Sequence, residues 1–442
     1  MRLSRGEAAW TLTEAANEPF FNLIIRYVFA PYFATTLAAG AAEGASLWAY
    51  SVGASGLLIA ILAPLLGSIA DSGARLKPWL AAVGGVTILA TLGLWFAAPG
   101  VPLLPVVFAV LVAGVAAEFM NLFSNALLPV CARQDRMGLL SGLAFGVAQL
   151  AGLLVLLAVF AIARADTGAP HLADRLAGPI AAAAVLLFLG PYLLLGPDRP
   201  GRARPSLVRG MAGLRETLGE AWASRDIRLF LLGRMVAADG MAIVFAFGAV
   251  LAGVTFGWKA GTLAVFGLVI TVFGVIGGFT GGLLDRWLGA KRLMLVGILL
   301  ISLGTASVIL TDERRLFGIP TGVALDQPLG SPQEWGFLLA GAFIAVGAAF
   351  AVTGMRTLMA LLAPPGKLAA YFGLYSFVGK ATAFVGPFLV GIITSATGSL
   401  RPGIAIALAF LLAGFLLLAG ARSPKSLLAA GPTPGREAAG GE

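Results

Sequence analysis

The sequence predicts an all-α integral membrane protein with twelve transmembrane helices, arranged as two six-helix bundles related by pseudo-symmetry. The composition is strongly apolar: 59% of residues are hydrophobic, 12% are charged and the mean hydropathy is +0.94. These values lie well outside those of soluble globular proteins. Apolar stretches long enough to cross a hydrocarbon core of ~30 Å recur along the chain. A third observation is one loop pattern that occurs once in each half of the 442-residue sequence.

The apolar stretches are continuous runs rich in Leu, Ala, Val and Gly. This favours helices, since the strands of a membrane β-barrel alternate in polarity over only ~10 residues. The 59 glycines also suit membrane helices, where small residues let backbones approach closely. We place the twelve spans at residues 18–40, 46–70, 79–98, 102–130, 139–163, 177–196, 229–254, 261–284, 292–311, 336–362, 370–396 and 402–421.

The placement of the basic residues predicts the orientation. Most of the 30 Lys and Arg residues fall in segments on the same side of the predicted membrane as the two termini. Loops on the other side hold Arg164, Arg175, Lys259, Arg314, Arg315 and Arg401. Because basic loops remain in the cytoplasm, we expect both termini to be cytoplasmic, in what we interpret as a bacterial inner membrane. The formal net charge of +9 therefore reflects topology and not a nucleic-acid partner.

A change in composition separates the two halves. Residues 196–205 are rich in Pro and Arg, and the segment that follows has mixed polarity. Residues 206–224 can form an amphipathic helix on the inner membrane surface or a solvated linker helix. We divide the chain into a cytoplasmic N-terminal segment (1–17), an N-terminal bundle (18–196), a basic cytoplasmic linker (197–228), a C-terminal bundle (229–422) and a disordered cytoplasmic tail (423–442).

The repeated loop has a Gly four residues before an Asp, followed by a Gly and basic residues. It occurs at residues 67–77 and again at 281–292, each time between the second and third spans of its half. Such an internal parallel repeat is found in secondary transporters that rock one half against the other. An Asp at a helix end can accept hydrogen bonds from a neighbouring helix N-terminus or pair with a basic residue. We therefore predict gating residues in these loops, although ordinary helix-end charge is the alternative: Asp71, Arg75, Asp285 and Arg286.

Ionisable residues inside the spans are the candidate site, since each costs ~2.5–3.5 kcal/mol near the bilayer centre and usually faces a cavity or a partner. Each half supplies one acid and one base in mid-span: Arg26, Glu118, Asp239 and Lys380. If these four converge on a central cavity, they suit a zwitterion or an organic anion, with a carboxylate on Arg26 or Lys380. The alternative is two structural salt bridges, Glu118 with Arg26 and Asp239 with Lys380.

Proton coupling is expected at the two buried acids, because a carboxyl group held away from water takes up a proton more readily. Glu118 and Asp239 are therefore the coupling candidates. Arg234 and Arg356 lie nearer the span ends, where their guanidinium groups can reach the interface. Besides the four mid-span charges, the candidate substrate-binding or coupling residues are Glu18, Tyr32, Asn125, Arg356 and Tyr375. Aromatic residues that could shape the pocket, or simply pack between helices, are Phe29, Tyr32, Phe123, Phe245 and Tyr375.

Several motifs carry a resemblance to a known family. The second loop copy, with Arg286 after Asp285, is similar to the signature of the major facilitator superfamily. Further motifs are Ala30-Pro-Tyr32-Phe, Asn125-Ala-Leu-Leu-Pro, Asp239-Gly, Arg356, Phe372-Gly-Leu-Tyr375, Gly379-Lys380 and Gly386-Pro. These resemble the autophagy-related vacuole-effluxer-like branch of that superfamily. The resemblance implies a twelve-helix transporter and, for the eukaryotic namesakes, amino acid export from the vacuole. Where the branch often has Asp-Trp-Ala-Asn-Ser, this chain has Glu14-Ala-Ala-Asn-Glu18, which adds a carboxylate at the mouth of the first span.

Other classes of function lack the residues that they need. The chain has no Gly-x-x-x-x-Gly-Lys-Ser/Thr motif for nucleotide hydrolysis. With one His and one Cys, it has no metal-ligand motif, no disulfide and no enzyme-like cluster. We expect a monomeric secondary transporter, not an enzyme, with a small polar solute and membrane lipids as partners and no cofactor, metal or nucleic acid. A receptor or assembly factor that reuses the fold is the alternative, since fold does not fix function.

Overall fold

The computed structural model describes residues 3–38, 41–73, 75–164, 171–201, 206–258, 260–323, 325, 327–364 and 366–422. The chain is almost entirely helical, with one short β-hairpin. The predicted tail, 423–442, lies outside the described residues.

The N-terminal half consists of helices that pack into one bundle. Its elements are α1 (Arg5–Ala15), α2 (Glu18–Phe20), the π-helix η1 (Phe21–Tyr27), α3 (Phe29–Tyr32), the π-helix η2 (Phe33–Leu37), α4 (Ala41–Gly73), α5 (Lys77–Gly93), the 3-10 helix η3 (Leu94–Phe96), α6 (Leu103–Cys131), the 3-10 helix η4 (Gln134–Arg136), α7 (Met137–Arg164) and α8 (Leu172–Leu195).

The C-terminal half follows a linker helix, α9 (Leu207–Ala223). Its elements are α10 (Arg225–Phe256), α11 (Ala260–Leu288), α12 (Ala290–Leu310), β1 (Arg315–Leu316), β2 (Ile319–Pro320), α13 (Pro332–Leu362), α14 (Leu368–Val378), α15 (Val385–Thr397) and α16 (Leu400–Gly420). The two strands pair antiparallel, with Arg315 opposite Pro320.

The predicted all-α membrane fold is confirmed. Among the described residues, ten helices are long and apolar enough to cross a membrane. The first predicted span is instead a chain of short α- and π-helical pieces, and the eleventh is α14 and α15 with a non-helical break at 379–384. Proline explains where these segments change. Pro31 cannot donate to the carbonyl one turn back, and Pro387 stands in the first turn of α15, where a missing N–H is tolerated.

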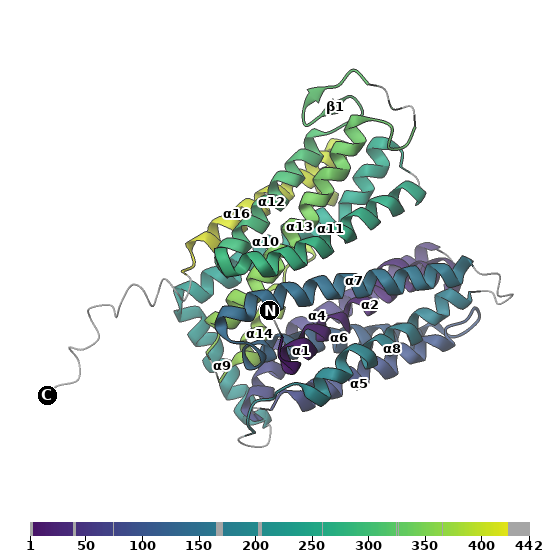
Figure 1. The fold of residues 1–442 in the computed structure, drawn as a ribbon. Coiled ribbons are helices and arrows are strands. Elements are labelled where there is room, and N and C mark those ends of the chain that lie inside the picture. The colour runs from purple at the N-terminus through teal and green to yellow at the C-terminus, as the bar shows by residue number, and fades with distance from the viewer. Residues whose placement is uncertain are drawn as a thin grey trace.

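The two bundles meet at one end and diverge toward the other (Figure 1). We call the meeting end the basic end; it is formed by the start of α1, the α4–α5, α6–α7, α11–α12 and α13–α14 connections, α9 and the end of α16. We call the opposite end, which carries β1 and β2, the hairpin end. The sequence predicts that the basic end faces the cytoplasm.

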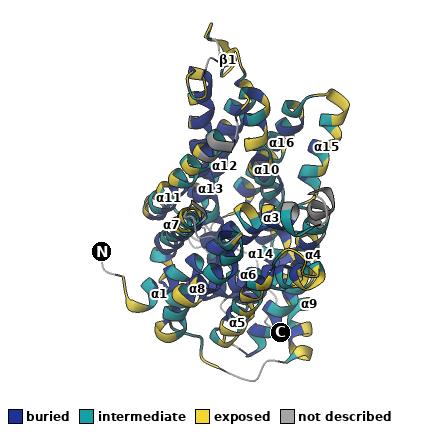
Figure 2. Cartoon of the chain, turned by 90° about the vertical axis from the view of Figure 1, so that its right-hand side faces the viewer, coloured by how far each residue is buried: buried dark blue, intermediate teal, exposed yellow. Residues whose placement is uncertain are grey.

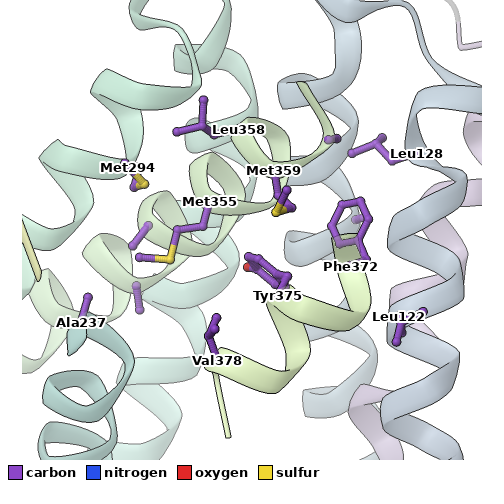
Figure 3. Close-up of a cluster of buried hydrophobic side chains, with 14 of the residues drawn as sticks. Leu122, Leu128, Ala237, Met294, Met355, Leu358, Met359, Phe372, Tyr375 and Val378 are labelled. Carbon is purple, nitrogen blue, oxygen red and sulfur yellow. The ribbon is translucent and has the colours of Figure 1, made fainter. Parts of the chain in front are cut away.

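One apolar core joins the two bundles. Buried residues concentrate in the central helices α6, α10, α13 and α14, whereas outer helices such as α15 are largely exposed (Figure 2). In Figure 3, Leu122 and Leu128 of α6 face Phe372 of α14, and Met355 and Met359 of α13 lie beside it. Because α6 belongs to the N-terminal half and α13 and α14 to the C-terminal half, this core holds the halves together.

Candidate functional site

A cavity of about 410 Å³ lies between the bundles. Twelve of its lining residues belong to the N-terminal half and come from the broken first segment, α4 and α6. Lys380 is the one lining residue from the C-terminal half among those described, and it extends from the break between α14 and α15. The lining residues are Glu18, Phe21, Ile25, Arg26, Val52, Ser55, Gly56, Ile59, Val110, Gly114, Glu118, Asn121 and Lys380.

An ion pair crosses this cavity. The Lys380 ammonium donates to Oε1 of Glu118 at 2.8 Å, and the side chains are 37% and 16% exposed. Glu118 stands in the middle of α6, while Lys380 is presented by a segment without helical backbone. Both charges therefore lie in a low-dielectric region and satisfy each other while solvent still reaches them. The pair also connects the two halves of the molecule.

A second ion pair lies on the N-terminal wall of the cavity. Arg26 donates to Glu18 Oε1 and to Asn22 Oδ1, both at 2.8 Å. The arginine reaches back along its own segment because side chains in helices tilt toward the helix N-terminus. Neither expected salt bridge, Glu118 with Arg26 or Asp239 with Lys380, is formed among the described residues. The structure brings Arg26, Glu118 and Lys380 together as predicted, but Arg26 pairs with Glu18 and Lys380 pairs with Glu118.

Asp239 lies behind the cavity wall and does not line it. Its side chain is buried on α10 and faces Thr382 of the break, and it makes no ion pair within the described part of the chain. One turn away, the Arg234 guanidinium carbon lies 3.4 Å from the centroid of the Tyr375 ring. A Cβ on Gly379 would overlap this guanidinium group, 3.0 Å from Nη2. The backbone of the break thus passes close over Arg234, and a side chain at residue 379 would displace this guanidinium group.

A third ion pair joins the halves on the side of the basic end. Arg356 of α13 is 4% exposed and pairs with Glu14 at the end of α1. It also approaches the Ser141 carbonyl of α7 at 3.5 Å. Sequence reasoning predicted Arg356 as a site residue but missed Glu14. The available signal was an arginine in a span for which no acidic partner had been found.

Two asparagines that follow Glu118 along α6 extend its polar side. Asn121 lines the cavity and accepts a hydrogen bond from Asn17 Nδ2 at 2.5 Å. Asn125 lies one turn further along α6, partly buried. Asn121 was missed, although its spacing of three residues from Glu118 places both on one helix face.

Most of the predicted aromatic residues lie away from the cavity. Tyr32 donates to the Ala97 carbonyl at 3.0 Å, and Phe29 and Phe123 are fully buried in helix packing. Phe245 is 54% exposed on the outside of α10. Among the described lining residues, the aromatic wall is instead Phe21.

At the basic end, Asp71 of the first loop copy links α4 to α14 through a hydrogen bond. Asp71 accepts from Arg199 Nη2 at 2.6 Å and from the Ala370 N–H at 2.7 Å. Arg199 belongs to the linker and Ala370 to the opposite half. The predicted gating residue Arg75 lies 3.6 Å from Asp198 and its side chain is 65% exposed. Asp71 therefore holds the halves together through a different arginine from the one in its own loop.

In the second loop copy, Asp285 at the end of α11 packs against α7. Asp285 is buried against Gly138 at the start of α7, where an added Cβ would collide with the carboxylate. Further along this crossing, a Cβ on Gly142 would lie 2.6 Å from the Gly278 carbonyl oxygen, and one on Gly282 would lie 2.7 Å from that of Leu139. Small residues allow this close approach. Arg286 is exposed and forms no ion pair in the part of the chain that the structure describes.

Two helical bundles around a charged cavity, closed at one end by a pseudo-symmetric pair of helix crossings, are the arrangement of the major facilitator fold. Solved structures share this fold. The proton:xylose symporter XylE matches with a TM-score of 0.69 and 15% identity, covering 95% of this chain and 96% of that one. FucP in an outward conformation matches with a TM-score of 0.69 and 14% identity, covering 95% and 98%.

Sequence comparison gives the family. The profile of the family described as "Vacuole effluxer Atg22 like" matches residues 134–430. The chain belongs to this family, which confirms the resemblance seen in its motifs.

Fungal autophagy-related proteins are similar to part of the chain. Autophagy-related protein 22-1 of Penicillium rubens is 26% identical over 216 residues, covering 48% of this chain and 35% of that protein. Autophagy-related protein 22 of Yarrowia lipolytica is 26% identical over 290 residues, covering 59% and 46%. The matched part thus spans less than half the length of each of these relatives.

Proposed function

We propose that the protein moves a small zwitterion, an amino acid or related metabolite, across the membrane by alternating access and with proton coupling. The ion pair between Glu118 and Lys380 carries this proposal, because it places an acid and a base side by side in a cavity between the halves. A second acid and base, Glu18 and Arg26, line the same cavity. The family description names an effluxer, which favours export.

A zwitterion can replace these internal partners without leaving a charge unpaired. Its carboxylate takes the place of Glu118 at Lys380, and its ammonium group binds the carboxylate that is released. This matters because removing one partner of a buried pair is costly, whereas exchanging partners is not. Since Glu118 and Lys380 belong to different halves, the solute then becomes the connection between them. Binding is thereby linked to the relative position of the bundles.

Protonation of Glu118 provides a route to coupling. A neutral Glu118 no longer holds Lys380, so the Lys380 ammonium group is available to the carboxylate of the solute. The ammonium group of the solute then pairs with Glu18, the other acid that lines the cavity. A proton and a solute molecule therefore favour the same rearrangement. Asp239, buried behind the break that carries Lys380, is the second coupling candidate.

Orientation and surroundings complete the proposal. We place the basic end at the cytoplasmic face of a bacterial inner membrane, with both termini inside and the protein acting as a monomer. The crossings at the basic end are closed and the bundles diverge toward the hairpin end. On this orientation the structure represents an outward-facing state.

A binding screen followed by flux measurement tests the function. Purified protein is heated with amino acids, peptides and organic acids, and a ligand is recognised by a rise in the unfolding temperature. The substitution Lys380→Gln should weaken binding of the identified zwitterion about tenfold or more, because a charge-assisted hydrogen bond is lost. Arg133→Gln is the matched control, since that side chain is 86% exposed and distant from the cavity.

Flux in proteoliposomes with and without a pH gradient then tests the coupling. Accumulation only with the gradient supports proton coupling, while equal flux in both supports movement down the gradient of the solute alone. If no solute of the screen stabilises or crosses, and a protein partner binds instead, the receptor or assembly-factor function is favoured.

A further inference from the structure

We propose that the linker helix α9 lies in the plane of the membrane at the basic end, with one face in the headgroup layer of an anionic leaflet. We call this the lipid face of α9. It consists of Leu207, Val208, Met211, Leu218 and Trp222, which are 48–80% exposed. No described part of the chain covers them.

An adjacent side of α9, about 100° around the helix from the lipid face, is firmly packed on α4. Gly210, Thr217 and Ala221 are buried, at the spacing of one helix face. Ser68 Oγ of α4 donates to the Gly210 carbonyl at 2.7 Å, and a Cβ on Gly210 would lie 2.8 Å from Cα of Ile69. The helix is therefore fixed in orientation, and the lipid face does not turn toward α4.

The position of α9 along α4 sets its depth. Its contacts fall on the last turns of α4, a membrane-crossing helix that ends at Gly73. An amphipathic helix at this level lies at the boundary between headgroups and acyl chains. In water, a contiguous row of exposed large apolar side chains would be unfavourable, whereas here it borders lipid.

The charges around the lipid face fit an anionic leaflet. Arg215 continues the row at helical spacing from Met211, and exposed Arg225 follows the helix. Arg228 donates to the Trp222 carbonyl at 2.5 Å and lies 5.7 Å from the centre of its ring. Tryptophan is enriched at the membrane interface, and basic residues close to the surface attract anionic lipid.

The acidic residues of α9 lie on another face and are neutralised by protein. Lys367, at the start of α14, binds Glu216 at 2.9 Å and Glu220 at 2.7 Å. These carboxylates, which anionic headgroups would repel, therefore face the C-terminal half. This separation of acidic and basic sides favours lipid over an acidic or basic protein as the occupant of the lipid face.

Spin labels at two exposed positions of α9 test the proposal in the full chain. Cys131, the one cysteine of the sequence, is replaced by Cys131→Ser, which retains a hydroxyl partner for Tyr192. Labels are then attached to Met211→Cys or, as the control, to Ala223→Cys, which is exposed and lies about 120° around the helix from Met211. The protein is reconstituted in phosphatidylcholine vesicles with or without phosphatidylglycerol.

We expect the label at residue 211 to be reached by oxygen and not by a water-soluble nickel chelate, at a depth of ~5–10 Å. The label at residue 223 should show the reverse. The depth at 211 should increase when phosphatidylglycerol is present. Equal chelate access at both sites overturns the membrane location, equal depth in the two vesicles overturns the anionic preference, and shielding of residue 211 from both reagents indicates a protein partner or a second copy.

A second measurement keeps the native cysteine. Lipids brominated near the headgroup quench tryptophan fluorescence, and the wild type is compared with Trp222→Phe. We expect brominated lipid to quench a component of the wild-type fluorescence that comes from Trp222 and is missing from Trp222→Phe. Identical fractional quenching in the two proteins contradicts the proposal.

Discussion

The two helix crossings that close the basic end occupy equivalent places in the two halves but differ in construction. At the α7–α11 crossing, Asp285 packs directly against Gly138 and glycines from both helices interlock. At the α4–α14 crossing, Asp71 is held by Arg199 and by the Ala370 N–H, and α9 covers the outside. Glycines also interlock at the α4–α14 crossing, where a Cβ on Gly67 or Gly373 would overlap the backbone of Ala369 or Ala63. The internal repeat supplies two crossings, but the chain has only one linker between its halves. Only one crossing can therefore receive a third layer, and this layer adds Arg199 to a crossing that is itself closely packed.

The largest expected effect concerns the buried ion pair between Arg356 and Glu14, which lies next to α7. Arg356→Gln leaves Glu14 without its partner, and breaking a buried pair destabilises by about 3–5 kcal/mol. The double variant Glu14→Gln with Arg356→Gln should recover part of this loss, because no unpaired charge remains. Thermal unfolding of the single and double variants checks the prediction. Additive losses would show that the two side chains do not act as a pair.

Next is the charge that holds the α4–α14 crossing. Arg199→Gln should cost about 1.5–3 kcal/mol, since a hydrogen bond between charged groups with little exposure is lost. Arg75→Gln is the control from the same loop region, with a side chain that is 65% exposed. We expect it to change stability by less than about 0.5 kcal/mol. A larger effect of Arg75→Gln than of Arg199→Gln would show that Arg75, the gating residue predicted from the sequence, stabilises this crossing.

Close packing at the α7–α11 crossing is tested with one methyl group. Gly142→Ala places a Cβ 2.6 Å from the Gly278 carbonyl oxygen, and such overpacking typically costs about 1–3 kcal/mol. Gly190→Ala is the matched control on α8, where nothing lies within 4 Å of an added Cβ. Distances between spin labels across the basic end should lengthen in Gly142→Ala alone. Unchanged distances would mean that the crossing adapts to the methyl group.

The smallest effect is expected where α9 binds the C-terminal half. Partial burial lowers the pKa of Lys367, but its hydrogen bonds to Glu220 and Glu216 outweigh this, so that its pKa lies above the ordinary value. Because the pKa of Lys367 is raised in the folded state, its ion pairs contribute fully to the free energy of unfolding below the pKa of the unfolded chain, about 10.4. This contribution is lost only as the pH rises through the folded pKa.

The glutamates are largely exposed, so Lys367→Gln should cost no more than about 0.5 kcal/mol. The difference in unfolding temperature from the wild type should stay constant from about pH 6 to pH 9, well below the lysine pKa. A difference that vanishes within this range would contradict the ion cluster.

Much of the fold could be predicted because hydropathy and the repeated loop report long continuous helices and their order. The broken segments were harder, since averaging over an apolar stretch does not detect a change from α- to π-helix. Pro31 and the Gly379–Pro387 region were the available signs.

The lining of the candidate site was predictable in part, but its ion pairs were not: Asp239 does not line the cavity, and Asn121 does. Arg26, Glu118 and Lys380, with Glu18, were expected in the cavity and line it. Which acid meets which base depends on helix rotation and on how the halves cross, and spacing along the chain does not determine either. For the same reason Arg199, 128 positions from Asp71, could not be found from the loop motif.

The most direct test of the proposed transport is gradient-driven uptake by Glu118→Gln. This change keeps the shape of the side chain but removes the group that binds Lys380 and accepts the proton. We predict that proteoliposomes containing the variant exchange the identified solute across the membrane but no longer accumulate it when a pH gradient is applied. Accumulation equal to that of the wild type would contradict the assignment of Glu118 as the coupling residue.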